Sequence, residues 1–202
     1  EQATGKNVLG FVKRIESVAN EHVILCPQNV DIYRVAQATS LPVFAQHIDG
    51  IFYGAHTGHT LPEAVKANGA KGALINHAEH QLSMKEIEEC VKRCKDIGLL
   101  SMVCANTPRK AKEISSFKPD YIAIEPPELI GTGIPVSKAE PEIIIGTLTA
   151  VKGTKVLCGA GISEPADVKK ALELGCVGVL VASAIVKSSK PEKVLKGFLD
   201  VL

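Results

Sequence analysis

The sequence lacks tryptophan altogether, and aromatic residues make up only 4% of its 202 positions. It also lacks a strong charge of either sign, because 23 Lys and Arg residues face 22 Asp and Glu residues. Proteins that bind nucleic acids typically carry a basic patch, often with aromatic side chains interleaved, and neither feature is present. We therefore expect no nucleic-acid partner and a small-molecule substrate instead.

Long apolar runs are also missing, so nothing in the sequence predicts a membrane-spanning helix or a membrane partner. The first residues, Glu-Gln-Ala-Thr-Gly-Lys, lack the charged and apolar regions of a signal peptide. We expect a cytoplasmic protein.

A Cys-x-x-Cys pair is missing too, although the sequence contains six cysteines. Most of them lie inside apolar, strand-like runs, which favours reduced core thiols over a disulfide framework or a zinc site. We expect no metal. The cysteines are Cys26, Cys90, Cys94, Cys104, Cys158 and Cys176.

What the sequence does contain is a regular alternation of short β-branched runs and amphipathic stretches. The predicted strands are His22 to Cys26, Pro42 to Gln46, Gly72 to Asn76, Leu99 to Cys104, Asp120 to Glu125, Lys155 to Gly159 and Val177 to Ala182. The predicted helices are Lys6 to Ala19, Asp31 to Ala38, Pro62 to Asn68, Ser83 to Ile97, Pro108 to Phe117, Pro141 to Val151, Glu164 to Leu174 and Pro191 to Leu202. Without any linker-like tract, residues 1–202 are predicted to form a single domain.

This alternation predicts parallel strands joined by right-handed crossovers, and its unbroken repetition favours a closed α/β barrel. Eight helices and seven strands, beginning on a helix, match an eightfold (β/α)8 TIM barrel without its first strand. We expect that strand upstream of Glu1. The alternative is an open sheet of seven strands, which would leave two edges with unpaired backbone groups.

Chemically capable residues fall at the carboxyl ends of the predicted strands, where such folds place their active sites. His77 follows one strand, with Glu79 two residues later, and Glu125 ends another. Small residues follow the last two strands, around Gly161 and at Ala182 and Ser183, and such turns let backbone N–H groups approach an anion. Together these positions predict a base, a neutral hydrogen-bond donor and an anion site around one cavity.

The segment after Glu125 is built like a hinged lid. Two prolines stiffen its start, an apolar tip follows, and two glycines near its end permit unusual backbone angles. The predicted lid consists of Pro126, Pro127, Glu128, Leu129, Ile130, Gly131, Thr132 and Gly133.

Two other enzyme classes fit the sequence less well. A metal-dependent hydrolase could draw on histidines and acids, but His-x-x-His spacing brings ligands together only on a helix, and these pairs fall in predicted loops. The candidate ligands are His56, His59, His77, Glu79 and His80. A Schiff-base aldolase would need a lysine in the cavity, whereas Lys155 lies at the opposite end of its strand.

Several motifs resemble the triosephosphate isomerase family, specifically its compact archaeal form, and the similarity runs from the first residues to the last. The motifs are Asn76-His77-Ala-Glu79, Glu125-Pro-Pro-Glu-Leu-Ile-Gly-Thr-Gly133, Gly54-Ala-His-Thr57-Gly-His and Pro42-Val-Phe-Ala-Gln46-His47-Ile-Asp49.

The resemblance implies an isomerase of glycolysis and gluconeogenesis that interconverts dihydroxyacetone phosphate and D-glyceraldehyde 3-phosphate without a cofactor. It implies that Glu125 is the base, that His77, neutral at a helix amino end, polarises the carbonyl, and that Glu79 orients charged groups nearby. Backbone N–H groups near Gly131, Gly161, Ala182 and Ser183 would bind the phosphate.

The resemblance further implies that the loop around Thr57 inserts into a second subunit, which predicts a dimer or a tetramer. The family's first strand ends in an Asn-x-Lys pair, which we expect upstream of Glu1. If that pair is lacking, the alternative is a catalytically impaired homologue that binds phosphosugars. Ala78 and Ala184 stand where the family usually has Ser and Gly.

Overall fold

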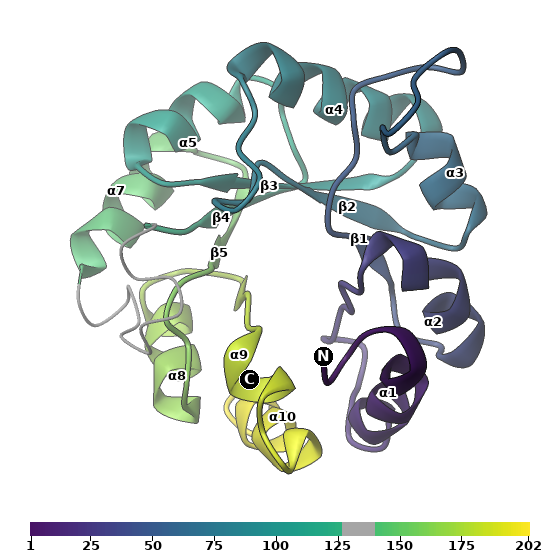
Figure 1. The fold of residues 1–202 in the computed structure, drawn as a ribbon. Coiled ribbons are helices and arrows are strands. Elements are labelled where there is room, and N and C mark those ends of the chain that lie inside the picture. The colour runs from purple at the N-terminus through teal and green to yellow at the C-terminus, as the bar shows by residue number, and fades with distance from the viewer. Residues whose placement is uncertain (127–139) are drawn as a thin grey trace. The chain divides into compact units, whose positions relative to one another are not determined.

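The computed structural model describes residues 1–126 and 140–202. Helices and strands alternate along the chain (Figure 1). The residues group into two compact units, the first formed by Glu1–Asn76 with His80–Met102 and the second by His77–Glu79 with Val103–Leu202. A single domain over residues 1–202 stays a prediction.

The first unit contains two short parallel strands, β1 and β2, paired with Phe44 opposite Gly72. The predicted strand at His22 to Cys26 is reduced to one parallel bridge, between Leu25 and Val43. The elements of this unit are η1 (Gly5–Asn7), α1 (Val8–Glu16), η2 (Asn29–Asp31), α2 (Ile32–Ala38), β1 (Phe44–Ala45), α3 (Pro62–Ala67), β2 (Gly72–Ile75) and α4 (Met84–Ile97).

Helix α4 shows why this part of the sequence folds as it does. Ser83 and Glu86 form a capping box, in which each side chain bonds the backbone N–H of the other residue. The helix ends at Gly98, whose φ of 69° suits a residue without a Cβ. Ile87, Cys90 and Val91 lie on its buried side, so the apolar spacing directs one face into the core.

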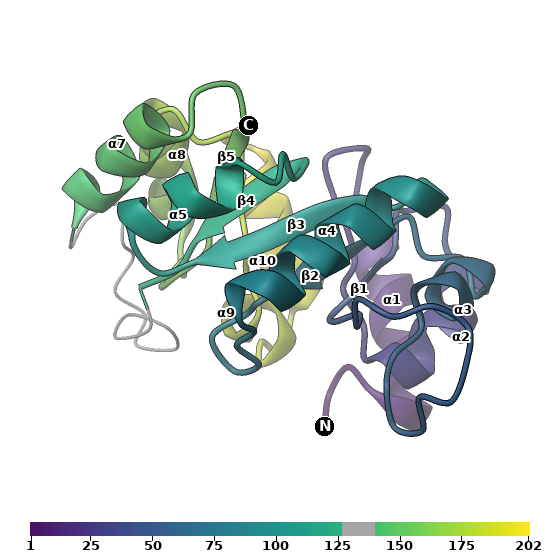
Figure 2. The ribbon, with the colours of Figure 1, turned by 90° about the horizontal axis from the view of Figure 1, so that it is seen from above.

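The second unit contains parallel strands whose hydrogen-bonded order follows the chain. In β4 and β5, Tyr121 lies opposite Lys155, and β5 pairs in turn with β6. Helices α5 and α7 pack side by side (Figures 1 and 2). The elements are α5 (Pro108–Ser115), β4 (Tyr121–Ile124), α7 (Pro141–Ala150), β5 (Lys155–Cys158), α8 (Pro165–Glu173), β6 (Gly178–Val179), α9 (Ser183–Val186) and α10 (Pro191–Leu199).

Strand β3 (Leu100–Ala105) contributes residues to both units. At its start, the N–H of Leu100 donates to the carbonyl of Lys71 over 2.9 Å. At its end, the carbonyl of Ala105 accepts the N–H of Glu125, also over 2.9 Å. Backbone pairing at this second point fixes Glu125 at the end of its own strand.

Six of the seven predicted strand segments form strands, and each predicted helix is present within a few residues of its expected ends. Helix α9 was not predicted, because only Ser183–Val186 form it and so short a segment has no helical periodicity to detect. Its amino end coincides with the predicted anion site at Ala182 and Ser183.

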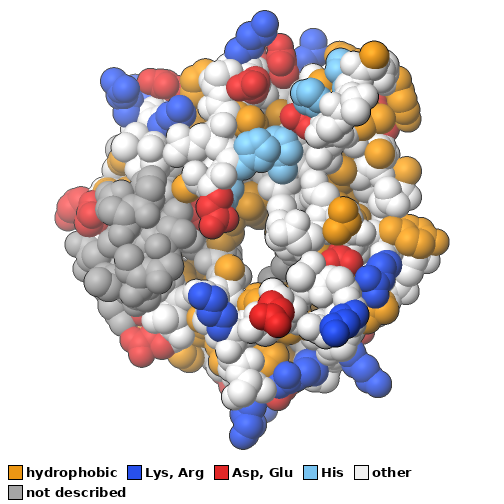
Figure 3. Space-filling view, in the orientation of Figure 1, with side chains coloured by type: hydrophobic (Ala, Val, Ile, Leu, Met, Phe, Trp, Pro, Cys, Tyr) orange, Lys and Arg blue, Asp and Glu red, His pale blue; other side chains and the backbone are white. Residues whose placement is uncertain are grey.

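The cysteines bear out the expectation of core thiols for most positions. All six are free, and all except the exposed Cys26 are buried. Among the described residues, no helix is both long and apolar enough to span a membrane. Lys and Arg are interspersed with Asp and Glu on the face shown in Figure 3, as the balanced charge predicts.

Candidate active site

Glu125 lies immediately after β4, at the carboxyl end of the strand, as predicted. Its side chain is only 3% exposed although the residue is acidic. An apolar strand, Ile122 to Ile124, delivers it from the core, and Pro126 follows without a backbone N–H to continue the pairing. The strand therefore places a buried carboxylate where the chain leaves the sheet.

The environment of Glu125 disfavours its charged form. Burial raises the pKa of the carboxyl group above its ordinary value, and this effect outweighs the hydrogen bond from the Cys104 side chain and the proximity of His77, which both lower it. Among the described residues, Oε2 has no hydrogen-bond partner. A carboxylate that is desolvated and incompletely hydrogen-bonded is a stronger base than one in water.

Gly159, directly after β5, makes room for this carboxylate. A Cβ at that position would lie 2.5 Å from Oε1 of Glu125, and closer still to Cγ. The N–H of Gly159 also donates to the carbonyl of Ile124 over 3.0 Å. Any larger residue at position 159 would therefore force the Glu125 side chain to move.

His77 is held in a turn that leaves its side chain 24% exposed. The backbone N–H of Glu79 donates to its Nδ1 over 3.3 Å. A ring nitrogen that accepts such a bond carries no proton, so this contact favours the tautomer with its proton on Nε2.

The expectation that His77 lies at a helix amino end was wrong. The chain turns at Ala78 and Glu79, and α4 begins only at Met84, where the capping box fixes its start. A single N–H in the turn, rather than the end of a helix, therefore bonds Nδ1.

His77 and Glu125 converge, as the sequence predicted. Nε2 of His77 lies 3.7 Å from Oε2 of Glu125, within the same compact unit. This distance is too long for a hydrogen bond but short enough for both groups to contact one small molecule. A hydrogen-bond donor and a base around one point suit the removal of a proton from a carbon next to a carbonyl.

The comparisons with known proteins agree with this geometry. A family model described as "Triosephosphate isomerase" matches residues 2–198. The chain belongs to the triosephosphate isomerase family. It is 48% identical to the triosephosphate isomerase of Methanocaldococcus jannaschii, over 100% of this chain and 95% of that protein. It is 45% identical to that of Methanosarcina acetivorans, over 100% and 94%. Membership supports the predicted TIM-barrel class of parallel α/β fold, and the described strands are parallel.

Glu79, which the family resemblance assigns to a charged network, extends into solvent. Its side chain is 85% exposed, and Oε2 lies 3.7 Å from Nδ1 of His77. A carboxylate contact this exposed contributes little to stability. The backbone of Glu79, through its N–H, makes the contact with His77 that has hydrogen-bond geometry.

The predicted phosphate-binding residues follow two paired strands of the second unit. Gly161 comes after β5 with a φ of 74°, and Ala182 and Ser183 come after β6, at the start of α9. The N–H of Leu180 donates to the carbonyl of Cys158 over 2.9 Å, so pairing continues to the point where both turns begin. Gly131 lies outside the described residues.

The loop that carries Gly161 is fastened to α8 by Asp167, which is fully buried. Its Oδ2 accepts the N–H and the hydroxyl of Ser163, over 2.9 and 3.1 Å, and the N–H of Glu164 over 3.0 Å. Charge-assisted bonds of this kind are stronger than neutral ones, so they fix the end of the loop.

The predicted lid falls almost entirely outside the described residues. Only Pro126 is described, and it is buried beside Glu125. Pro127, Glu128, Leu129, Ile130, Gly131, Thr132 and Gly133 are not, so their role as a lid stays a prediction.

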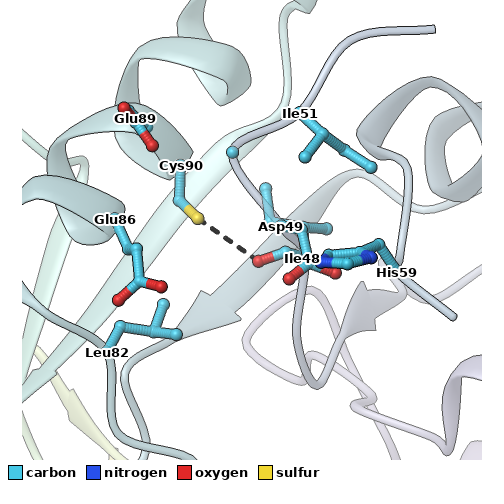
Figure 4. A pocket seen from close by; sticks show the side chains of 9 residues that line it. Ile48, Asp49, Ile51, His59, Leu82, Glu86, Glu89 and Cys90 are labelled. Atoms are coloured by element: carbon cyan, nitrogen blue, oxygen red, sulfur yellow. Dashed lines mark hydrogen bonds between the residues drawn. The ribbon is translucent and has the colours of Figure 1, made fainter. Parts of the chain in front are cut away.

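The predicted interface loop belongs to the first unit, and Thr57 within it is exposed. Asp49 and Thr60 close the base of the loop, because each donates its backbone N–H to an oxygen of the other. Cys90 of α4 also bonds the base of the loop, because its thiol donates to the carbonyl of Ile48 over 3.3 Å (Figure 4).

The pocket in Figure 4 lies between this loop base and α4 and includes none of the predicted catalytic or phosphate-binding residues. Its lining combines acidic and apolar side chains with one histidine, and all of these residues belong to the first unit. The lining residues are Ile48, Asp49, Gly50, Ile51, His59, Leu82, Glu86, Glu89 and Cys90.

Nothing in the described part of the chain favours the metal-hydrolase alternative. Residues 1–126 and 140–202 contain no group of three or more His, Cys, Asp or Glu arranged to hold a metal ion. His56 and His59 meet edge to face, with ring centroids 6.0 Å apart. His80 stacks on His47 at 4.0 Å.

Sequence reasoning missed three residues that shape the site. The sequence marks Gly159 only as the end of a predicted strand, whereas its missing Cβ accommodates Glu125. The Cys104 thiol and the Asp167 carboxylate were treated as ordinary core and helix positions. An acidic residue inside the first turn of α8, followed by a buried apolar face, was the only available signal for Asp167.

Proposed function

We propose that this protein is an aldose-ketose isomerase that interconverts dihydroxyacetone phosphate and D-glyceraldehyde 3-phosphate. The observation that carries the proposal is the approach of His77 Nε2 to Glu125 Oε2, at 3.7 Å, in a member of the triosephosphate isomerase family. Relatives named triosephosphate isomerase, 45–48% identical over the whole chain, support it.

In the proposed reaction, Glu125 removes a proton from the carbon next to the substrate carbonyl. The electron pair of that C–H bond forms the carbon–carbon double bond of an enediol-like intermediate, and the carbonyl oxygen takes up negative charge. Glu125 then returns the proton to the neighbouring carbon, so no cofactor or external oxidant takes part. Burial raises the pKa of Glu125, which strengthens it as a base for this weakly acidic proton.

His77 acts on the two oxygens of the substrate. Its neutral ring carries a proton on Nε2, which donates to the carbonyl oxygen and stabilises the developing charge. Moving that proton to one oxygen and recovering a proton from the other completes the exchange of hydroxyl and carbonyl groups. The bond from the Glu79 N–H to Nδ1 supports this tautomer.

The proposal places the phosphate at the turns after β5 and β6. Gly161, Ala182 and Ser183 would supply backbone N–H groups there, together with Gly131 from the lid. Closure of the lid, from Pro126 to Gly133, would exclude water and so protect the intermediate from phosphate elimination.

We also propose that the protein assembles as a dimer or tetramer through the loop containing Thr57. The exposed aromatic residues Phe52 and Tyr53 of this loop support a role in association. Glycolysis and gluconeogenesis in the cytoplasm are the proposed setting, and the free, buried thiols fit a reducing compartment.

A turnover assay in deuterated water tests the proposal. We expect interconversion of the two triose phosphates, with deuterium from the solvent incorporated at the carbon next to the carbonyl. Binding of a phosphoglycolate-like analogue without turnover would instead reveal a phosphosugar-binding homologue and would overturn the proposal. Turnover with full retention of the substrate hydrogen would show that Glu125 returns the abstracted proton before its carboxyl group exchanges with solvent.

A further inference from the structure

Asn76, the residue before His77, has an unusual backbone conformation. Its φ is +62°, and the only other described non-glycine residue with a positive φ is Lys118, at +57°. Asn76 is only 8% exposed, whereas Lys118 is exposed. The left-handed region costs a non-glycine residue about 1–2 kcal/mol, although asparagine tolerates it better than most. Such a conformation persists where surrounding contacts hold it.

The side chain of Asn76 supplies one such contact. Its Oδ1 accepts the backbone N–H of Leu82 over 2.9 Å. This bond closes a loop from residue 76 to residue 82, which contains both His77 and Glu79. Ser83 follows at once and is fixed by its capping box with Glu86, so the far end of the loop is anchored to α4.

Two hydrogen bonds therefore fix the position of His77, one through the loop backbone and one at the ring itself. The Asn76 bond sets the path of the loop, and within the loop the Glu79 N–H reaches Nδ1 of the His77 ring. We propose that Asn76 is a positioning residue for the imidazole of His77: its left-handed backbone and its amide oxygen together aim Nε2 at the reacting atoms.

The effect of Asn76 on catalysis rests on the proposed function, whereas its effect on the position of the His77 ring does not. Asn76 precedes His77 directly, so a change in its φ and ψ rotates the imidazole about the backbone. A misplacement of about 1 Å at a catalytic group costs on the order of 10²-fold in rate. Substrate binding depends mainly on the phosphate site, so the loss should appear in kcat rather than in KM.

Three substitutions separate the backbone from the side chain. Asn76→Gly keeps the left-handed conformation but removes the acceptor. Asn76→Asp keeps an acceptor of the same shape and tolerates the conformation. Asn76→Ala loses both. We expect kcat to fall about tenfold or more in Asn76→Gly, further in Asn76→Ala, and least in Asn76→Asp, with KM within about twofold throughout.

The decisive readout does not depend on turnover. In protein labelled with 15N-histidine, NMR reports the tautomer and environment of each ring, and a His77→Gln variant identifies the His77 signals. We expect these signals to shift in Asn76→Gly and to return towards the wild-type position in Asn76→Asp. Lys118→Gly is the matched control, because it relieves a left-handed residue elsewhere and should leave both kcat and the His77 signals unchanged.

Wild-type kcat and wild-type His77 signals in Asn76→Gly would overturn the proposal. It would also be overturned if Asn76→Asp were as damaging as Asn76→Gly, because the acceptor would then not be responsible. If the wild-type protein had no isomerase activity, the proposed function would be refuted. A shift of the His77 signals in Asn76→Gly would still support the positioning role of Asn76.

Discussion

The turn that carries His77 and the strand end that carries Glu125 prepare their side chains in opposite ways. Hydrogen bonds position the imidazole, since Glu79 bonds its ring and Asn76 closes its loop, and the ring remains partly exposed. The carboxylate is buried, with Oε2 lacking a hydrogen-bond partner among the described residues.

The contrast follows from what each group must do. A hydrogen-bond donor must point in one direction, and fixed bonds at the back of the ring achieve this. A base must hold its proton well, and removal from water raises the pKa of a carboxyl group. Activity is therefore expected to depend on the orientation of the His77 ring, and on the burial and charge of the Glu125 carboxyl group.

The largest expected effect comes from shortening Glu125. In Glu125→Asp the carboxylate retracts by one methylene from the reacting carbon, so kcat should fall on the order of 10²-fold or more. Affinity for a phosphoglycolate-like analogue, measured by calorimetry, should change little. The matched control is Glu113→Asp, at a half-exposed glutamate of α5, which should keep wild-type kcat. Normal turnover in Glu125→Asp would remove Glu125 from the mechanism.

A smaller effect is expected when the space beside the carboxylate is filled. A Cβ in Gly159→Ala would collide with the Glu125 side chain, so either the carboxylate or β5 must shift. We expect kcat to fall about tenfold and stability to fall by about 1–3 kcal/mol, measured by urea unfolding. Gly153→Ala is the matched control, because a Cβ at this exposed glycine would meet no other atom. Its φ of 88° is unfavourable for alanine, so stability should fall while kcat stays at the wild-type value. Wild-type activity in Gly159→Ala would show that this close approach is unimportant.

The burial of Glu125 predicts that replacing this residue stabilises the protein by an amount that depends on pH. The pKa of Glu125 is raised on folding from about 4.5, so the folded state holds a proton that the unfolded state releases, and stability falls as pH rises through that window. Glu125→Gln removes the buried charge and should stabilise the protein by about 1–3 kcal/mol at pH 7. The gain should disappear below the unfolded pKa.

Urea unfolding of both proteins at a series of pH values measures this difference. A gain that is constant with pH would show that Glu125 is not destabilised by burial. Turnover of the wild-type enzyme should likewise decline as pH falls through the raised pKa of Glu125, because the base becomes protonated.

The smallest effect is expected at Lys118, where a left-handed backbone has no catalytic neighbour. Lys118→Gly removes a steric cost of about 1–2 kcal/mol but adds backbone entropy to the unfolded chain, so a net gain below about 1 kcal/mol is expected. Thermal unfolding measures the gain. A loss of stability would mean that the Lys118 side chain contributes more than its backbone costs.

The sequence predicted the position of Glu125 because apolar periodicity and proline are strong local signals. Ile122 to Ile124 read as a buried strand, and Pro126 marked its end. The predicted start of the helix at Ser83 holds for a similar reason, since Ser83 and Glu86, the two partners of its capping box, lie within one turn of helix. His77 was placed beside Glu125 because parallel strands deliver their ends to one edge.

What the sequence could not predict depends on contacts between distant segments or on single dihedral angles. The space that Gly159 leaves for Glu125 joins residues on two strands, and a glycine in a turn has many explanations. The left-handed Asn76 gave no periodic signal. His22 to Cys26 had the composition of a strand, but only Leu25 finds a partner, because pairing requires a neighbour in register.

The closed base of the loop that carries Thr57 has a practical consequence. Reciprocal bonds between Asp49 and Thr60, and the Cys90 thiol on Ile48, fix where the loop leaves and re-enters the fold. Residues 52–59 are exposed beyond that base. Exchanging this segment should therefore abolish the proposed association while the helices and strands that carry the loop keep their packing.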